Sequence, residues 1–225
     1  MSSNMFLYWV SGSIPCWKAM IALEEKGLAG YPNKKISFSD KGHKSEEILK
    51  LNPRGQIPTF KDGDVVVNES NAICFYLERK FPDQGTKLVP TDISEYARVL
   101  QRVAEVENLT SCIIKNLAQY RFRTPKDKLD EELLKTKYED VRTELKRWED
   151  YLAASGGYVV GSNFTMADVF FFPYVAFGVR LGLDVSKYPA ISAYYDKVKD
   201  RPSVKATWPP HWTDGPGDSS IMGPV

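Results

Sequence analysis

The chain has 225 residues, 43% of them hydrophobic and 26% charged, which suits a globular protein with one large domain or two small ones. The formal net charge of +1 excludes a strong overall field, so neither nucleic acid nor an anionic membrane is expected as a partner. Three cysteines are too few for a disulfide framework or a zinc site, and no segment approaches membrane-spanning length.

The N-terminal residues favour a strand over a targeting signal. Residues 5–10 form a short apolar run, which is too short for the core of a signal peptide and has no basic flank. The cysteines at 16, 74 and 112 are scattered along the chain. We therefore expect a reducing, cytoplasmic environment.

The first eighty residues alternate between strand and helix patterns. Asp62-Gly63 between two β-branched and aromatic runs is a strong hairpin signal. Prolines at positions 15 and 82 suit a helix start and a helix stop. The predicted order is βαβαββα, with elements at residues 5–10, 15–27, 35–38, 45–51, 59–61, 65–67 and 70–81.

The remainder of the chain is predicted to be helical. Residues 82–92 contain Pro, Gly, Asp and Thr without periodicity, which is typical of a linker. Helical patterns follow at 93–120, 126–154, 165–180 and 188–200, and the tail from Trp208 is rich in Pro, Gly and Asp. We expect an α/β domain at 1–82, a linker at 83–92 and an all-helical domain with an irregular tail at 93–225.

Five local motifs occur in order along the chain. They are Ser13-Ile14-Pro15-Cys16, His43, Asn52-Pro53-Arg54-Gly55-Gln56-Ile57-Pro58, Glu69-Ser70-Asn71-Ala72-Ile73 and Thr165-Met166-Ala167-Asp168. Each alone is weak, but together and at these spacings the chain resembles a cytosolic glutathione transferase of the serine type, similar to the theta class. The resemblance covers nearly the whole chain and implies a thioredoxin-like domain followed by a helical domain.

The resemblance requires a hydroxyl that contacts the sulfur of glutathione, and three residues could supply it. Ser13 precedes the helix started by Pro15, so it is either a simple N-cap or a donor to a bound thiolate. The resemblance implies the second role. Ser11, two residues earlier, and Tyr8, in the predicted strand, remain alternatives.

Further glutathione contacts are implied by the same resemblance. Ile57 would pair its main chain with the cysteinyl part of glutathione beside a cis Pro58, and Glu69 and Ser70 would hold the γ-glutamyl end. Ser70 is also an N-cap candidate. His43 and Gln56 would meet the glycine end, with Lys44 as an alternative cation to His43; a histidine in a polar loop is otherwise merely solvated.

The second-substrate site is less clearly indicated. Candidates are aromatic or adaptable residues near the end of the long helix and in the tail, for which ordinary packing is an equal explanation: Tyr120, Phe122, Trp208, His211 and Trp212. Cys16 lies one turn inside the first helix, where packing is favoured over thiol chemistry. Thr165 and Asp168 form a capping box that is expected to support folding and not chemistry.

The resemblance implies a glutathione transferase that joins glutathione thiolate to apolar electrophiles. The stretches Tyr8–Trp17 and Trp208–Trp212 look most like those of the rho class of fish and other aquatic animals. Glutathione would be a co-substrate, with no cofactor or metal, and the chain is expected to form a homodimer. A thiol oxidoreductase using Cys16 and a non-catalytic binding relative remain alternatives; the serine at the first motif position argues against the former.

Overall fold

The computed structural model describes residues 4–225 and divides the chain into two compact units. The first unit comprises the residues up to Leu88 together with Pro202–Asp214. The second comprises Val89–Arg201 and Gly215–Val225. Within the described residues, no helix combines the length and the apolar character needed to cross a membrane.

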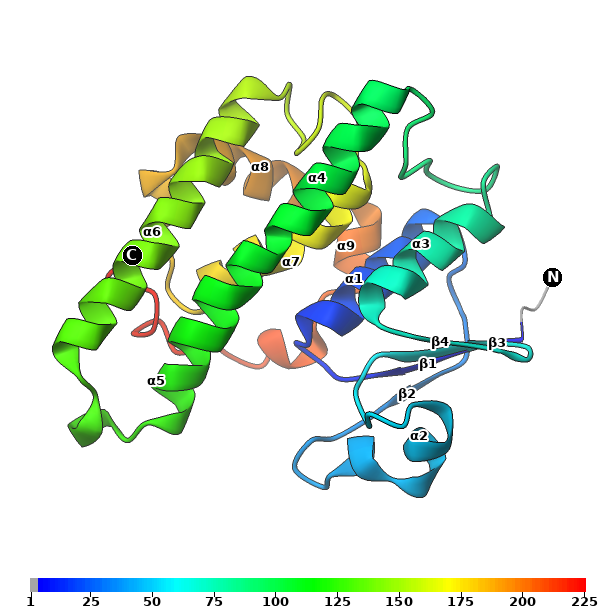
Figure 1. Ribbon diagram of the computed structural model, residues 1–225, viewed down its shortest axis with the longest axis horizontal. Helices are drawn as coiled ribbons and strands as arrows, with labels where there is room; N and C mark the ends of the chain where they lie inside the picture. Colours follow the sequence, from blue (N-terminus) through cyan, green and yellow to red (C-terminus); the bar gives the residue numbers. More distant parts are fainter. Residues whose placement is uncertain (1–3) are drawn as a thin grey trace. The chain divides into compact units, whose positions relative to one another are not determined.

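The first unit contains a four-stranded sheet, and its element order confirms the predicted βαβαββα pattern (Figure 1). The strand order is β2-β1-β3-β4, in which β1 is parallel to β2 and the other neighbours are antiparallel. Its elements are β1 (Met5–Trp9), α1 (Ile14–Glu25), β2 (Asn33–Lys35), α2 (Glu46–Leu51), β3 (Thr59–Asp62), β4 (Val65–Asn68) and α3 (Ser70–Lys80).

Buried side chains of the central strands anchor this sheet. Leu7 on β1 pairs with Phe60 on β3, and both are fully buried. The helices α1 and α3 pack against each other along one side of the sheet (Figure 1). The β3–β4 hairpin is confirmed, but Asp62 pairs with Val65, so the two-residue turn is Gly63-Asp64. Gly63 has φ +60°, which a tight hairpin turn requires.

The second strand differs from the prediction. The apolar residues at 36 and 38 predicted a strand at 35–38, but β2 spans Asn33–Lys35. The main chain of β1 decides these bounds, because Leu7 and Trp9 pair with Asn33 and Lys35. All three residues of β2 are exposed. An edge strand is defined by its backbone partner, so its side chains gave no alternating signal.

The second unit is helical, as predicted. Its main helices are α4 (Ile93–Leu109), α5 (Gln119–Arg123), α6 (Glu131–Ala154), α7 (Met166–Arg180) and α8 (Pro189–Lys199). A π-helical stretch, Thr110–Ala118, joins α4 to α5, so the predicted helix at 93–120 is one continuous rod with a widened segment. The helix predicted from residue 126 begins at Glu131, because the Asp130 carboxylate caps it by accepting from the Leu133 amide at 3.0 Å.

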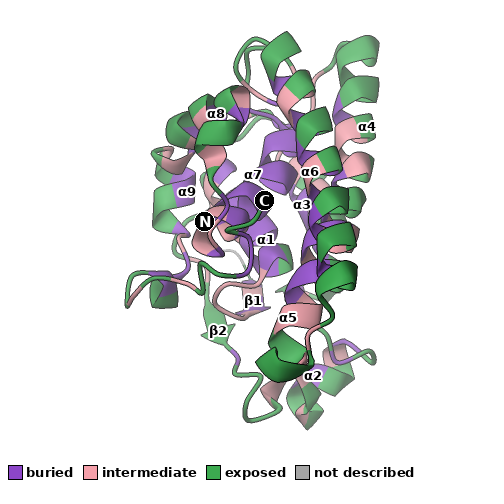
Figure 2. Ribbon diagram, turned by 90° about the vertical axis from the view of Figure 1, so that its left-hand side faces the viewer, coloured by how far each residue is buried: buried purple, intermediate pink, exposed green. Residues whose placement is uncertain are grey.

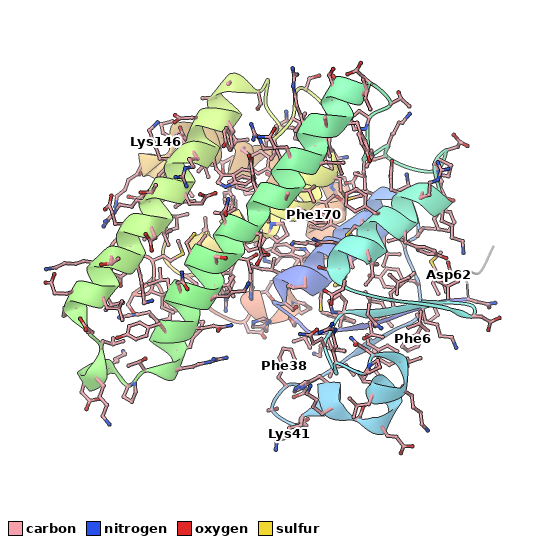
Figure 3. All side chains as sticks on the ribbon, in the orientation of Figure 1. Phe6, Phe38, Lys41, Asp62, Lys146 and Phe170 are labelled. Atoms are coloured by element: carbon pink, nitrogen blue, oxygen red, sulfur yellow. The ribbon has the colours of Figure 1, made fainter. Side chains whose placement is uncertain are left out.

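The core of the second unit is α7. Figure 2 shows this helix as almost wholly buried, and Phe170, Phe171 and Phe172 are completely so. A helix that is apolar all round must be enclosed by other elements. Figure 3 labels Phe170 within this unit and, by contrast, Lys146 on the outward face of α6.

The predicted capping box of α7 is confirmed. Asp168 accepts from the main-chain amides of Val159 (2.8 Å) and Thr165 (2.7 Å), and from the Thr165 hydroxyl (3.0 Å). The carboxyl is completely buried, and burial raises its pKa to about 6 although the hydrogen bonds act in the opposite direction. Asp168 thus joins the loop at Val159 to the start of the central helix.

The segment after α8 differs most from the prediction, because Pro202–Asp214 belongs to the first unit and not to the helical one. It contains the short helix α9 (Pro202–Ala206), which packs on α1 (Figure 1). The Ser203 hydroxyl donates to the Glu25 carboxylate, and the Trp17 indole donates to the Thr207 hydroxyl at 3.0 Å. The final residues are also docked, since the Arg142 guanidinium donates to the Pro224 carbonyl at 2.6 Å.

Candidate active site

The β1–α1 connection is a tight turn that places Ser13 at the start of α1. The Ser13 amide donates to the Val10 carbonyl at 3.2 Å, and Gly12 has φ +76°, which is the left-handed conformation that a type II turn requires at its third position. Ser13 is the N-cap of α1, and its hydroxyl accepts from the Cys16 amide at 3.4 Å. The hydroxyl is therefore held at the positive end of the helix dipole.

The two alternative hydroxyls have other partners. Ser11 Oγ forms a 2.6 Å hydrogen bond with Nδ1 of His211. The Tyr8 phenol donates to the Glu47 carboxylate on α2 at 2.8 Å. Burial, reinforced by Glu47, raises the pKa of Tyr8 to about 12. Of the three candidates, only Ser13 is at the cap of α1.

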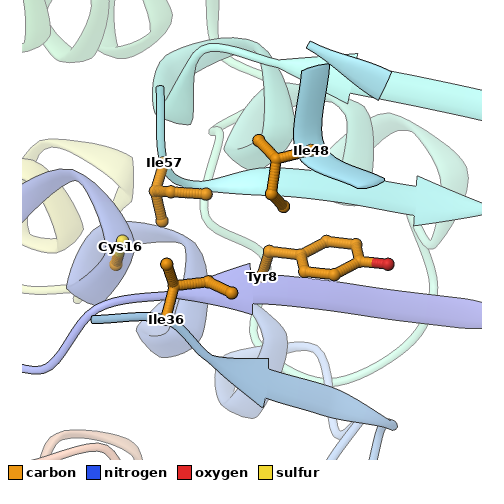
Figure 4. Close-up of a cluster of buried hydrophobic side chains, with 5 residues drawn as sticks. All are labelled: Tyr8, Cys16, Ile36, Ile48 and Ile57. Carbon is orange, nitrogen blue, oxygen red and sulfur yellow. The ribbon is translucent and has the colours of Figure 1, made fainter. Parts of the chain in front are cut away.

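Cys16 is sequestered below this turn. Its sulfur is fully buried and accepts from the Val10 amide at 3.4 Å. Burial raises the pKa of its thiol to about 11, so the thiolate is scarce at neutral pH. Figure 4 shows Cys16 beside Ile36 and Ile57, which belong to one buried cluster with Tyr8 and Ile48. The packing role predicted for Cys16 agrees with this environment.

The same cluster fixes the loop that precedes β3. The Ile57–Pro58 peptide bond is cis, and the Ile57 side chain is buried against the cluster. The Asn52 side chain, itself buried, donates to the Gln56 carbonyl at 2.9 Å and accepts from the Arg54 amide at 3.1 Å. Within residues 4–225, no hydrogen bond occupies the main-chain amide or carbonyl of Ile57. This leaves the main-chain amide and carbonyl of Ile57 able to pair with a peptide.

The start of α3 offers a second set of polar groups. Glu69, an exposed residue, has φ +75°, a conformation that non-glycine residues rarely adopt and that is concentrated at functional sites. Ser70 was predicted as an N-cap but is the first residue inside the helix, with Glu69 at the cap position. The Glu69 side chain does not cap the first-turn amides of α3. Such amides can bind an anion.

The candidates for the glycine end lie around a short 3₁₀ turn, Gly42–Lys44. His43 is half-buried with its ring edge-on to Phe38. Lys44 donates to the Arg54 carbonyl at 2.8 Å, so its ammonium supports the loop before Ile57. The Gln56 side chain is exposed. The loop thus joins His43, Lys44 and Gln56 into one polar region of the first unit.

The five second-substrate candidates do not all fall in one unit. Trp208, His211 and Trp212 belong to the first, and Tyr120 and Phe122 to the second. Trp208 and Trp212 pack edge-on against Trp17 of α1, with ring centroids 5.2 and 5.4 Å away. In the second unit, Phe122 is 60% exposed, whereas the Tyr120 hydroxyl accepts from the Asp130 amide at 2.9 Å.

Sequence reasoning missed three features of this site. It did not predict that Asn52 organises the loop, that Glu69 has a positive φ, or that His211 bonds to Ser11. The sequence placed Asn52 in the motif that ends at Pro58 but gave it no role of its own, although a buried asparagine side chain often bonds to a neighbouring loop backbone. Among the described residues, no group of three or more His, Cys, Asp or Glu side chains is arranged to hold a metal ion.

Comparisons with known proteins agree with this geometry. Residues 3–79 match the N-terminal domain of glutathione S-transferases, and residues 113–207 match the C-terminal domain. The chain is 44% identical to glutathione S-transferase A of Pleuronectes platessa over 226 residues, which cover 100% of both proteins.

Solved structures show the same relationship. A glutathione S-transferase from the Antarctic clam Laternula elliptica superposes with a TM-score of 0.91 at 49% identity, covering 98% of this chain and 99% of the other. A delta-class glutathione transferase from Nilaparvata lugens gives 0.82 at 26% identity, covering 97% and 98%. The chain therefore belongs to the glutathione S-transferase family.

Proposed function

We propose that this protein transfers glutathione, as a thiolate nucleophile, to the electrophilic carbon of apolar small molecules, and that Ser13 stabilises the thiolate. The observation that carries the proposal is the hydroxyl of Ser13 at the N-terminus of α1. A hydroxyl has one proton to donate and two acceptor positions. Accepting from the Cys16 amide leaves the proton of Ser13 for a bound sulfur, so capping and catalysis are compatible.

The energy required matches what such a site can supply. A free thiol of this type has a pKa of about 8.5. Lowering it by about two units needs about 2.7 kcal/mol of preferential binding to the thiolate. A hydrogen bond to a charged group contributes about 1.5–3 kcal/mol, and the end of a helix dipole contributes about 0.3–1 kcal/mol more.

The remaining groups are proposed to hold the peptide so that its sulfur meets Ser13. The unpaired main chain of Ile57, beside Pro58, would pair with the cysteinyl residue. The Glu69 carboxylate would bind the γ-glutamyl ammonium, while Ser70 and the first-turn amides of α3 would bind its carboxylate. His43 and Gln56 would bind the glycine end. Fixing the reactants in this way contributes to catalysis by orientation.

Ser70→Ala is expected to weaken glutathione binding by about 1–3 kcal/mol, the range for losing a hydrogen bond to a charged group. Isothermal titration calorimetry measures this directly. Ser94→Ala is the matched control, because Ser94 also lies in the first turn of a helix, α4, but is exposed in the other unit. If the Ser70→Ala variant and the unchanged protein bind glutathione with equal affinity, Ser70 does not belong to the glutathione site.

The proposed activity is tested by glutathione conjugation of a model aryl halide, run beside a disulfide-reduction assay. Conjugation by the unchanged protein that falls in Ser13→Ala supports a serine-type transferase. Disulfide reduction that is lost in Cys16→Ser would instead indicate an oxidoreductase, which the buried thiol of Cys16 with its raised pKa argues against. Glutathione binding without either reaction would indicate a non-catalytic relative.

The apolar co-substrate is proposed to contact aromatic or adaptable side chains, as the sequence predicts. The candidates are Tyr120 and Phe122 in the second unit and Trp208, His211 and Trp212 in the first. We also propose a cytoplasmic location, which the three free and buried cysteines support, because such thiols persist in a reducing compartment.

We propose further that the protein is a homodimer. Each unit exposes apolar side chains that an interface would cover: Val65 and Val66 on β4 of the first unit, and Ile93 and Tyr96 on α4 of the second. Light scattering at micromolar concentration is expected to give the mass of two chains. A single-chain mass would contradict the proposal.

A further inference from the structure

His211 is separated from the β1–α1 turn by 200 residues but lies directly on it. Its Nδ1 forms a 2.6 Å hydrogen bond with the hydroxyl of Ser11. Its ring also covers Gly12 so closely that a β-carbon at Gly12 would stand 2.6 Å from Cε1 of the imidazole. Ser11 and Gly12 are the two central residues of the turn whose last residue is Ser13.

The segment that carries His211, residues 207–212, packs against α1 and forms a hydrogen bond with it. Trp212 and Trp208 pack edge-on against Trp17, and they also pack against each other at 5.9 Å. Trp17 donates its indole N–H to Thr207 at 3.0 Å, and its main-chain amide donates to the Ser13 carbonyl at 2.9 Å. The helix that Ser13 caps, α1, therefore also holds the segment that places His211 against the turn.

We propose that His211 is a positioning residue for the catalytic hydroxyl. This inference rests on the proposed role of Ser13. The imidazole holds the Ser11-Gly12 turn in the conformation that directs the Ser13 hydroxyl at the sulfur of glutathione. The C-terminal segment thereby completes the site of the first unit.

The composition of the turn explains why a contact from His211 would be needed to fix its conformation. Gly12 has the broadest conformational freedom of any residue type, and Ser11, Gly12 and Ser13 are all partly exposed. A turn of this composition has few contacts of its own to define one geometry. A hydrogen-bond donor displaced by about 1 Å can cost about a hundredfold in rate. The ring of His211 supplies both a polar contact and a steric limit.

His211 is suited to mutational analysis because its side chain is exposed, whereas Trp212 beside it is buried. Substitution of His211 keeps the contacts of Trp17, Trp208 and Trp212 with one another, although it removes the edge-on contact of the imidazole with the Trp212 ring. We expect His211→Ala to fold normally, to bind glutathione with unchanged affinity, and to lower the turnover number by about tenfold, within the range for misplacement of a catalytic group. The pKa of the bound glutathione thiol, followed by its ultraviolet absorbance, should rise.

Two matched variants separate the hydrogen bond from the packing of the ring. His211→Asn keeps a polar atom near the position of Nδ1, and His211→Phe keeps a ring over Gly12 without that atom. A positioning hydrogen bond predicts that Asn restores turnover and the low thiol pKa better than Phe. The double variant Ser11→Ala/His211→Ala should be no slower than His211→Ala alone, because His211→Ala already removes the contact with Ser11.

Amide hydrogen exchange in residues 10–17 gives a readout that does not depend on turnover. Exchange there should increase in His211→Ala and in Ser11→Ala. Unchanged exchange, or an unchanged thiol pKa and turnover number in His211→Ala, would overturn the proposal. A different result would count against the proposed function: the unchanged protein neither lowers the pKa of the glutathione thiol nor conjugates glutathione, yet His211→Ala increases amide exchange in residues 10–17. In that case His211 would hold the turn, but the turn would have no catalytic role.

Discussion

Replacing Ser13 by alanine is expected to slow glutathione conjugation near neutral pH by at least about tenfold, which corresponds to a loss of about 1.4 kcal/mol of transition-state stabilisation. The substitution removes the hydroxyl at the N-cap of α1 but leaves Ile57, Glu69 and Ser70 unchanged. Glutathione affinity should therefore change little at a pH where the thiol stays protonated. The defect should appear in the turnover number.

The pH dependence of the same variant gives a second measurement. If Ser13 stabilises the thiolate, its loss raises the pKa of the bound thiol toward the free value of about 8.5. The acid limb of the rate profile should then move to higher pH, and raising the pH should recover part of the lost rate. An ultraviolet titration of the thiolate in the complex should report the same shift.

Two control variants make the assignment specific. Ser13→Thr retains a hydroxyl at the cap and should keep more activity than Ser13→Ala. Tyr8→Phe removes the phenol that donates to Glu47 and should leave conjugation near its normal rate. Normal turnover in Ser13→Ala, or loss of turnover confined to Tyr8→Phe, would contradict the serine assignment.

Asp168→Ala is expected to destabilise the second unit by about 3 kcal/mol or more, measured by chemical denaturation. The substitution leaves the buried amides of Val159 and Thr165 without their acceptor, and each unsatisfied group costs about 1–3 kcal/mol. Asp168→Asn should also be costly, because its amide NH₂ would meet the donors of Thr165. Asp184→Ala is the matched control: Asp184 caps a short exposed turn in the same unit, so its loss should cost about 1 kcal/mol or less.

Stability should also depend on pH through Asp168. Its folded pKa of about 6 lies above the unfolded value of about 3.9, so the folded protein binds more protons between these values. The contribution of this group to the free energy of unfolding is therefore full below about pH 4 and declines as pH rises to about 6. Asp168→Asn should lack that decline. An identical pH dependence in both proteins would assign the effect to other groups.

The local patterns in the sequence predicted much of this protein correctly. The apolar run at 5–10, the Asp62-Gly63 signal and the Pro15 helix start predicted the thioredoxin-like order of elements. The box at Thr165 and Asp168 was also correct. These features depend on residues within a few positions of each other, where steric preferences and caps act directly, so they can be recognised without the folded structure.

Other features were decided by the tertiary structure. The bounds of β2 followed from its pairing with β1. Ser70, which was predicted as the N-cap, is instead the first residue of α3, because Glu69 takes the cap position with a positive φ. The segment Pro202–Asp214 joined the first unit through contacts to α1. Backbone pairing and packing between distant segments are selected by the whole fold, and the local residue pattern does not specify them.

For the site, the sequence determined which residue types are available, and the structure determined which of them meet. The sequence favoured Ser13 as the catalytic hydroxyl and kept Ser11 and Tyr8 as alternatives. In the structure only Ser13 of these three caps α1, while Ser11 bonds to a histidine 200 residues away. No local periodicity or spacing encodes a contact at that separation. Such a contact exists because folding closes the intervening chain and brings the C-terminal segment back against the first helix, where the Trp17 cluster holds it in place.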